Sequence, residues 1–247
     1  MAKTSGLGDN FYIAGYDVSG DTNSLSRVGG GPAVIPQTSI VQSAQARAGG
    51  LRTGDLQWVS FFNDDTLADS AHTALKGISV DDQVCSYLRG TAIGNAMASC
   101  VAKQIGYDPT RGADGSLTLG VAATSNGYGI EWGQQLTAGI RTDTTGTNGA
   151  SLDGGAATTF GLQAYLHVFA VTGTSVTITL EDSANNSTWA AISGAAFAAA
   201  TGKGAQRISI SNAATVRRYV RAVSSGTFTN ARFAVNLVRN ETAGAVF

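Results

Sequence analysis

Residues 54–77 constrain the fold more than any other stretch, because a strand pattern there runs directly into a helix pattern. The first part alternates with period two and is rich in aromatic residues, as in a strand that is covered on both faces. One face carries Leu56, Trp58 and Phe62, and the other carries Gln57, Val59 and Phe61. This pattern predicts a strand within a covered sheet.

The second part of the stretch predicts the one clear helix of the chain, over residues 66–77. Thr66-Leu67-Ala68-Asp69 fits a capping box, in which a hydroxyl and a carboxylate satisfy free N–H groups of the first helical turn. Apolar residues then recur at helical spacing as far as Ile78. We therefore expect an amphipathic helix that begins at this capping box.

Strand patterns dominate the rest of the chain. A long antiparallel hairpin is expected over residues 96–122, with the Asp-Gly pair 114–115 near its tip. From residue 160 onward, alternating runs recur about every dozen residues, a spacing typical of a β-sandwich. These runs are 162–169, 176–181, 208–210, 216–223 and 233–238. The predicted fold class is mainly β: a β-sandwich or barrel domain with one flanking helix, followed by a C-terminal β-sandwich.

Two stretches have no regular pattern. Residues 33–53 have no strong period, so we expect an irregular loop that mediates interactions. Residues 141–159 are almost wholly Thr, Gly, Ala, Asn, Asp and Ser, which is typical of a linker, although a long loop within one domain has the same composition. A linker there divides the chain into a first domain over 1–140, with an N-terminal arm at 1–10, and a second domain over 160–247.

The charge of the chain is sparse and unevenly placed. Charged residues make up 13% of the chain, about half of the roughly 25% that is usual in soluble domains. Such a thinly charged surface repels copies of itself weakly, which favours assembly. Residues 1–157 hold nine Lys or Arg against fourteen Asp or Glu, whereas residues 158–247 hold seven against three. This split supports two domains with different surroundings.

The sequence offers little for catalysis or metal binding. His72 and His167 fall in different predicted domains, and neither has Cys, His or carboxylate residues at ligand spacing. The carboxylate pairs 64–65 and 81–82 lie at element ends, where turn and cap roles explain them. We therefore assign no catalytic, cofactor-binding or metal-binding residues, and we expect a protein that is not an enzyme.

The cysteines and the apolar runs bear on the cellular context. Cys85 and Cys100 are too few for a disulfide framework, and we expect both to be reduced. The start, MAKTSGLGDN, has no apolar signal-peptide core, and no run of about 20 apolar residues occurs. We expect a protein that is made in a cytoplasm and does not insert into a membrane.

One cluster in the second domain has the chemistry of a binding surface. Arg217, Tyr219 and Arg221 share one face of a predicted strand and give a cation–aromatic–cation stripe that suits an anionic glycan or a nucleic acid. The alternative is a solvated outer face on which the guanidinium groups pair with Glu181 or Asp182. The sequence leaves both interpretations open.

Seven stretches, spread in order along the chain, carry a resemblance. They are GDNFYIAGYDVSGD (8–21), SLSRVGGGPA (24–33), GLRTGDLQWVSFFND (50–64), RGTAIGN (89–95), AKQIGYDPTRGADGSLT (102–118), NGYGIEWGQQLTAGIRTDT (126–144) and VRRYVR with FTNARFAVNLVRN (216–240). Together they resemble the major tail proteins of long-tailed actinobacterial phages, the subunits of the tail tube. The likeness covers nearly the whole chain and is more specific than one short motif.

The resemblance implies a β-sandwich subunit with one flanking helix, six copies of which close a continuous β-barrel around a lumen. The predicted helix at 66–77 would be the flanking helix, residues 1–10 and 33–53 would join copies, and the hairpin at 96–122 would line the lumen. An extra β-domain such as 160–241 lies on the outside of such tubes. DNA passes through the bore.

The sequence-based hypothesis is a structural virion protein, the subunit of stacked hexameric rings that form a phage tail tube. Its expected partners are copies of itself, other tail proteins, and DNA that passes without specific binding through a weakly acidic bore. No cofactor is expected. Assembly would take place in the bacterial host cytoplasm, and the protein would reside in the virion tail. Two alternatives stay open: a carbohydrate-binding adhesin of the tail that contacts a host glycan, and an envelope-degrading tail enzyme.

Overall fold

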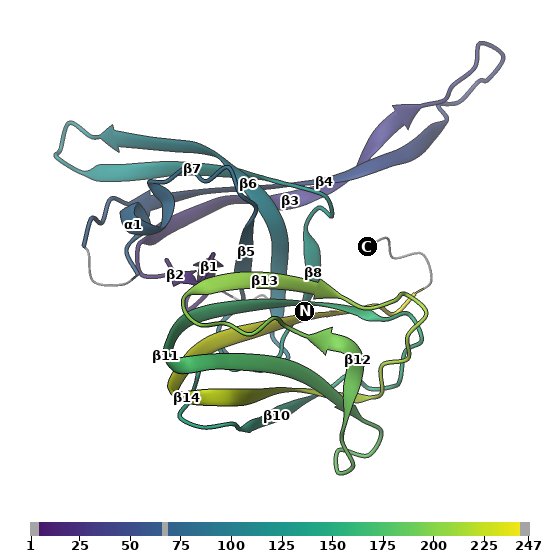
Figure 1. The fold of residues 1–247 in the computed structure, drawn as a ribbon. Helices are drawn as coiled ribbons and strands as arrows, with labels where there is room; N and C mark the ends of the chain where they lie inside the picture. The colour runs from purple at the N-terminus through teal and green to yellow at the C-terminus, as the bar shows by residue number, and fades with distance from the viewer. Residues whose placement is uncertain (1–4, 66–68, 243–247) are drawn as a thin grey trace.

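Alternating residues form strands over most of the chain, and these strands join one antiparallel sheet of 14 strands (Figure 1). The structure is a computed structural model that describes residues 5–65 and 69–242. The prediction of a mainly β fold is confirmed. Within the described residues, the one α-helix is short.

The strands and the helix fall into two halves of the chain. The N-terminal half, up to residue 140, contains β1 (Asn10–Ile13), β2 (Tyr16–Asp17), β3 (Thr22–Pro36), β4 (Arg47–Phe61), α1 (Ala71–Leu75), β5 (Gln83–Leu88), β6 (Ala96–Arg111), β7 (Leu117–Ser125) and β8 (Glu131–Gln135). The C-terminal half contains β9 (Arg141–Asp143), β10 (Asn148–Asp153), β11 (Leu162–Ser183), β12 (Ala190–Ala196), β13 (Gly204–Ser209) and β14 (Tyr219–Arg239). The predicted hairpin at 96–122 is confirmed as the antiparallel pair β6–β7.

The strand order joins the two halves through the sheet. Its main path runs β12-β11-β14-β8-β6-β5-β1-β2. At the junction, β14 pairs with β8, so that Asn236 lies opposite Gln135 and Leu237 opposite Gln134. A branch also leaves β6, in which β6 pairs with β7, β7 with β4, and β4 with β3. This branch, the layer β3-β4-β7-β6, lies across the top of the molecule in Figure 1.

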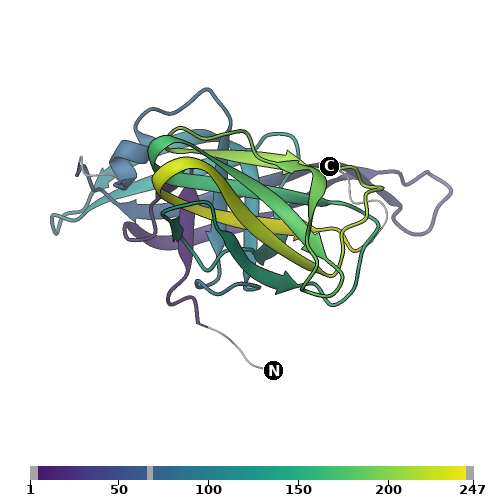
Figure 2. The same cartoon turned by 60° about the horizontal axis from the view of Figure 1, so that its bottom comes forward.

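Three hydrophobic clusters support the sheet. The first lies inside the C-terminal half, between the curved strands β11 and β14 (Figure 2). The second lies beneath the layer β3-β4-β7-β6, where Trp58 and Leu75 are buried and α1 covers the sheet. The third brings Tyr12 and Met97 of the N-terminal half together with Tyr165 of the C-terminal half. The two halves therefore pack against each other through a shared core.

The helix is shorter than the sequence predicts. α1 covers only Ala71–Leu75 instead of 66–77, and residues 66–68 of the expected capping box lie outside the described residues. Ser70 is the N-cap, and its hydroxyl accepts the backbone N–H of Thr73. The helix therefore begins at a serine cap four residues after the predicted threonine, because this hydroxyl satisfies the first turn.

Residues 33–53 belong to a β-hairpin, so the expectation of an irregular loop there is wrong. β3 and β4 pair from Thr22 opposite Ser60 out to Pro36 opposite Arg47. Residues 32–36 of β3 are all exposed. A strand with no core to face has no need of apolar residues at every second position, so its period is invisible in the sequence.

The sequence predicts a linker over residues 141–159. The structure instead has two strands there, and both pair with β14. β9 lies opposite residues 231–233, and β10 lies opposite residues 219–223. Arg141 and Asp143 form an ion pair of 2.6 Å with their side chains only 15% and 5% exposed. This segment therefore belongs to the sheet, and the division of the chain into two domains around it stays a prediction.

The C-terminal strands are longer than the predicted runs. β11 includes both 162–169 and 176–181, with Gly173 between them at a φ of 135°. β14 bends at Gly226, where φ is 123°. The register between the two strands shifts around Gly173. The bends allow each strand to cover more than one side of the same core, as the curved ribbons of Figure 2 show.

Candidate interaction surface

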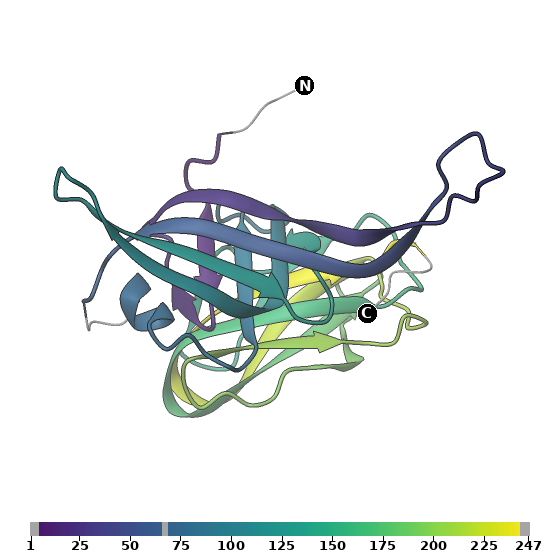
Figure 3. The same cartoon turned by 90° about the horizontal axis from the view of Figure 1, so that it is seen from above.

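The far part of the β3–β4 hairpin projects beyond the body of the molecule (Figures 1 and 3). It carries a series of large apolar side chains that nothing in the described part of the chain covers. They are Val34, Ile35, Ile40, Val41 and Leu51. Apolar side chains gathered on an exposed surface mark a site of contact with another molecule. The hairpin is therefore the first element of a candidate interaction surface.

The end of the hairpin is a tight turn with two apolar residues at its corners. The Gln42 N–H donates to the Ser39 carbonyl at 3.1 Å, and the Ser39 N–H donates to Gln42 Oε1 at 2.9 Å. Ile40 and Val41 lie between them and are 104% and 88% exposed. Turn corners favour Gly, Asn, Asp and Pro, so branched apolar residues there are unusual. Residues 39–42, named the hairpin tip below, form a preorganised apolar knob.

The layer β3-β4-β7-β6 has two free edges among the described strands. β3 pairs with β4 alone. β6 pairs with β5 only as far as Ala102, so residues 103–111 pair with β7 alone. Such rows of unpaired N–H and C=O groups are templates for adding a strand from another chain. The two edges run in opposite directions, because three antiparallel steps separate them.

One face of this layer is bare. Leu56, Trp58 and Val121 face the core, and the residues between them face away from it. Most side chains on the bare face are small or uncharged: Gly29, Gly31, Gln57, Val59, Phe61, Thr118, Gly120, Ala122 and Thr124. Arg27 and Asp55 also lie there and pair at 3.5 Å. The register places Lys103, which pairs with Asp82 at 2.9 Å, and Asp108 on the same face. The face looks away from α1 and from the C-terminal half (Figures 1 and 3).

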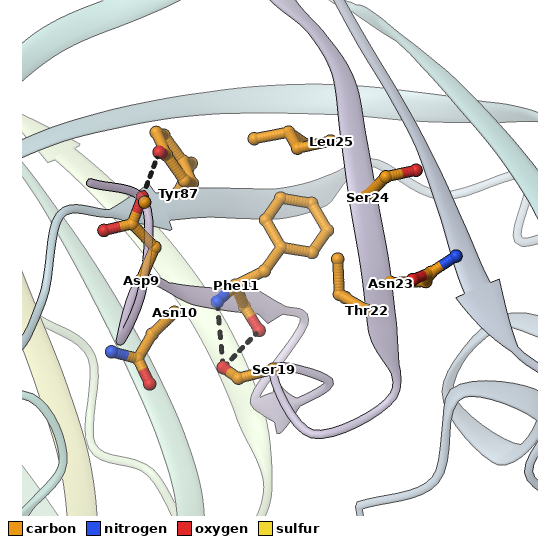
Figure 4. A pocket seen from close by; sticks show the side chains of 10 residues that line it. Asp9, Asn10, Phe11, Ser19, Thr22, Asn23, Ser24, Leu25 and Tyr87 are labelled. Atoms are coloured by element: carbon orange, nitrogen blue, oxygen red, sulfur yellow. Dashed lines mark hydrogen bonds between the residues drawn. The ribbon is translucent and has the colours of Figure 1, made fainter.

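A pocket of about 250 Å³ lies at the start of β3, at the opposite end of the strand from the hairpin tip (Figure 4). Phe11 and Leu25 supply its apolar wall. The Phe11 N–H donates to Ser19 Oγ at 2.9 Å. Tyr87 donates its hydroxyl to the Asp9 carboxylate, and burial together with this hydrogen bond raises the pKa of Tyr87. These internal bonds fix part of the pocket wall.

The predicted binding stripe is placed on the C-terminal half, with both of its arginines paired inside the chain. Arg217 lies 2.5 Å from Asp182, and Arg221 lies 2.7 Å from Glu181. Tyr219, at the start of β14, is half-buried. The carboxylate partners named in the second interpretation are thus present. Glycan or nucleic-acid binding by this stripe stays a prediction.

The two histidines do not meet. His72 on α1 shares a hydrogen bond with the hydroxyl of Tyr107. His167 is completely buried between the halves: the Gly15 N–H donates to its Nδ1 at 3.4 Å, and its Nε2 lies 2.9 Å from Ser86 Oγ. Burial lowers the pKa of His167 to about 3. His167 therefore serves as a neutral link between the β1–β2 turn and β5.

The cysteines and carboxylates form no ligand cluster in the part of the chain that the structure describes. Cys85 and Cys100 lie opposite each other on β5 and β6, and both are buried and free. Their hydrogen bond and burial raise the pKa of Cys85. Residues 5–65 and 69–242 contain no group of three His, Cys, Asp or Glu side chains that could hold a metal ion. No helix within the same ranges is long and apolar enough to cross a membrane.

The sequence assigns an interaction role to residues 33–53 but does not identify the residues that make the knob. The available signal is turn chemistry. A serine and a glutamine bracket Ile40 and Val41 in a stretch where Gly, Asn or Asp is expected at the corners. The pocket cannot be found in this way, because residues 9–11, 19–25 and 87 meet only in the folded chain.

No protein-family model and no curated protein match the chain. Several solved structures are similar to it. A chain from the virion of a native gene transfer agent particle matches 51% of this chain and 95% of its own length, with 12% identity and a TM-score of 0.40. The SPP1 Dit protein, a hub adsorption apparatus protein of phages that infect Gram-positive bacteria, matches 93% and 98%, with 12% identity and a TM-score of 0.33. A chain of the phage p2 baseplate matches 95% and 99%, with 10% identity and a TM-score of 0.34. These likenesses are loose and carry no function over to this chain.

Proposed function

We propose that this chain is a structural virion protein, the subunit of a phage tail tube. The observation that carries the proposal is the four-stranded layer β3-β4-β7-β6, which has one free edge on β3 and another on residues 103–111 of β6 among the described strands. Long free edges in a stable protein need a cover, and another copy of the same layer supplies one. The sequence resemblance to tail-tube subunits points in the same direction.

The geometry of the layer suits ring closure. Rotation about an axis roughly along the strands brings β3 of one copy beside β6 of the next. Because the layer has an even number of antiparallel strands, this junction is itself antiparallel and repeats identically around the ring. A closed barrel then has no free edges. A ring of six copies is the number that the resemblance implies.

In such a ring, the bare face of the layer lines the bore, because α1 and the C-terminal half occupy the other face (Figure 1). Its small side chains give a smooth wall. Arg27 is offset by Asp55 and Lys103 by Asp82, and Asp108 on β6 adds a negative charge. Non-specific DNA affinity comes mainly from Lys and Arg at phosphates, so this wall lets DNA pass without holding it.

The other parts of the chain take roles outside the bore. The β3–β4 hairpin and residues 1–10 join one ring to the next, and residues 160–247, which include Arg217, Tyr219 and Arg221, decorate the exterior. The protein is assembled in the bacterial host cytoplasm, functions in the virion tail with other tail proteins, and carries out no catalysis.

Ile105→Lys tests ring closure. Ile105 is 64% exposed and lies at the register shift within the free part of β6. A lysine on a strand edge opposes pairing with another strand. We expect this variant to sediment as a single chain, whereas the wild type and the control Thr188→Lys, on an exposed turn of the C-terminal half, sediment as rings. Complete rings from Ile105→Lys would contradict edge pairing.

A further inference from the structure

The hairpin tip and the pocket at the other end of β3 complement each other. We propose that the hairpin tip of one copy docks into this pocket of a second copy, with Ile40 and Val41 placed against Leu25. The inference rests on the proposed function, since it identifies the contact by which one ring of a tube meets the next. The proposed occupant of the pocket is a second copy of this chain.

The tip has the properties of a docking element. Ile40 and Val41 are almost fully exposed, and two hydrogen bonds between Ser39 and Gln42 fix the turn that presents them. A preformed turn loses little conformational freedom on binding. Burial of the two side chains removes apolar surface from water, which is the main driving force for such a contact.

The pocket has matching features. It offers about 250 Å³, with Leu25 and the buried Phe11 on its apolar side and mostly polar residues elsewhere, among them Asp9 and Ser19 (Figure 4). Two side chains of the rim are already fixed by hydrogen bonds to Tyr87 and to the Phe11 backbone. A pocket of this volume has room for one or two branched side chains.

The charges at the two ends of the β3–β4 ribbon are complementary. Residues 32–53 hold two arginines, Arg47 and Arg52, and no acidic residue. Residues 9–21 hold three aspartates and no Lys or Arg, and Arg89 pairs with one of them, Asp9, at 3.5 Å. Opposite charges steer the two ends together and oppose contact between like ends.

The contact has to form between copies. β3 has 15 residues, so its two ends lie roughly 50 Å apart, and the tip of a chain cannot reach its own pocket. A contact between different patches on two identical chains is heterologous, and it repeats from copy to copy without a built-in end. Docking of tip into pocket therefore produces a stack.

Disulfide trapping tests the docking. Val41→Cys and Leu25→Cys are purified separately, mixed, and oxidised mildly; the natural Cys85 and Cys100 are buried. We expect a linked dimer in the mixture and none from either variant alone. The control mixture pairs Val41→Cys with Ser187→Cys, on an exposed turn of the C-terminal half, and gives no dimer. No dimer from the first mixture, or equal dimer from the control, overturns the proposal.

Electron microscopy of Val41→Asp separates this inference from the proposed function. A carboxylate at the tip would lie beside Leu25 and near the Asp9 carboxylate of the rim, so we expect rings that do not stack, while Ser187→Asp stacks as the wild type does. Stacks of Val41→Asp as long as those of the wild type overturn the docking. Absence of rings in the wild type contradicts the tail-tube proposal instead, and the trapping result then still decides whether tip and pocket meet.

Discussion

His167 is a buried imidazole whose hydrogen bonds depend on its being neutral. Because the Gly15 N–H donates to Nδ1, the ring proton lies on Nε2, which donates to Ser86 Oγ. Ser86 continues the chain to Ser99 at 2.7 Å. A second ring proton, on Nδ1, would point at the Gly15 N–H, and the hydrogen bond between these two groups would be lost. The pattern explains why His167 is structural even though histidine is the residue most often used in catalysis.

Acid should therefore destabilise the protein through His167. Its pKa is about 3 in the folded chain against 6.5 for a free histidine, so from about pH 6.5 down to 3 only the unfolded state takes up the proton. The free energy of unfolding should fall across this window by at most about 5 kcal/mol. Denaturant titrations across this pH range measure the fall. His167→Gln should be less stable at neutral pH but should lose this part of the slope; an unchanged slope contradicts the account.

Glu131 and Arg207 form another buried polar link between the halves, from β8 to β13. Arg207 donates through Nε and Nη2 to the two oxygens of Glu131, both at 3.1 Å, and Tyr165 donates to the same carboxylate. Arg207→Met leaves a buried carboxylate without its cation, and we expect a loss of roughly 3–5 kcal/mol in denaturant unfolding. Adding Glu131→Gln should recover most of that loss. A double variant as unstable as the single one contradicts this explanation.

At the scale of the elements, the long strands of the C-terminal half depend on glycine at their bends. A Cβ on Gly173 would lie 2.5 Å from the Cα of Phe228, and the φ of 135° is itself unfavourable for other residues. Gly173→Ala should cost about 1–3 kcal/mol from the backbone alone. The control Gly202→Ala meets no atom within 4 Å. Thermal unfolding of the two variants tests this, and equal melting temperatures would argue against a structural role for the bend.

The elements that the sequence predicts well are those whose alternation faces a core. Leu119 and Val121 of β7 are buried at every second position, so the hairpin at 96–122 could be identified. The far part of β3 and β4 has no core, and β9 is held by the buried pair Arg141 and Asp143 against β14. Such contacts depend on partners that are distant in the chain, and no local pattern reports them.

The candidate interaction surface is also only partly predictable from the sequence. Its apolar tip lies within a stretch whose sequence indicates an interaction segment, although nothing in that pattern distinguishes Ile40 and Val41 from their neighbours. The free edges of β3 and of residues 103–111 become visible only when every strand has been paired. Strand pairing is a property of the folded sheet, so the sequence alone cannot distinguish an edge from an interior strand.

At the scale of the whole molecule, the fold places the edges that we propose for ring closure apart from the C-terminal half. The shared core around Tyr12, Met97 and Tyr165 and the β14–β8 pairing fix the C-terminal half on the side of the layer that carries α1. Both free edges and the bare face stay accessible (Figure 3). The C-terminal half therefore does not obstruct the closure of a ring.

Electron microscopy of the purified, negatively stained protein tests the central claim most directly, because copies joined through β3 and β6 must form closed objects. The account predicts rings with an open centre, and hollow tubes where rings stack. A field of separate single molecules at protein concentrations at which tail proteins assemble would contradict it.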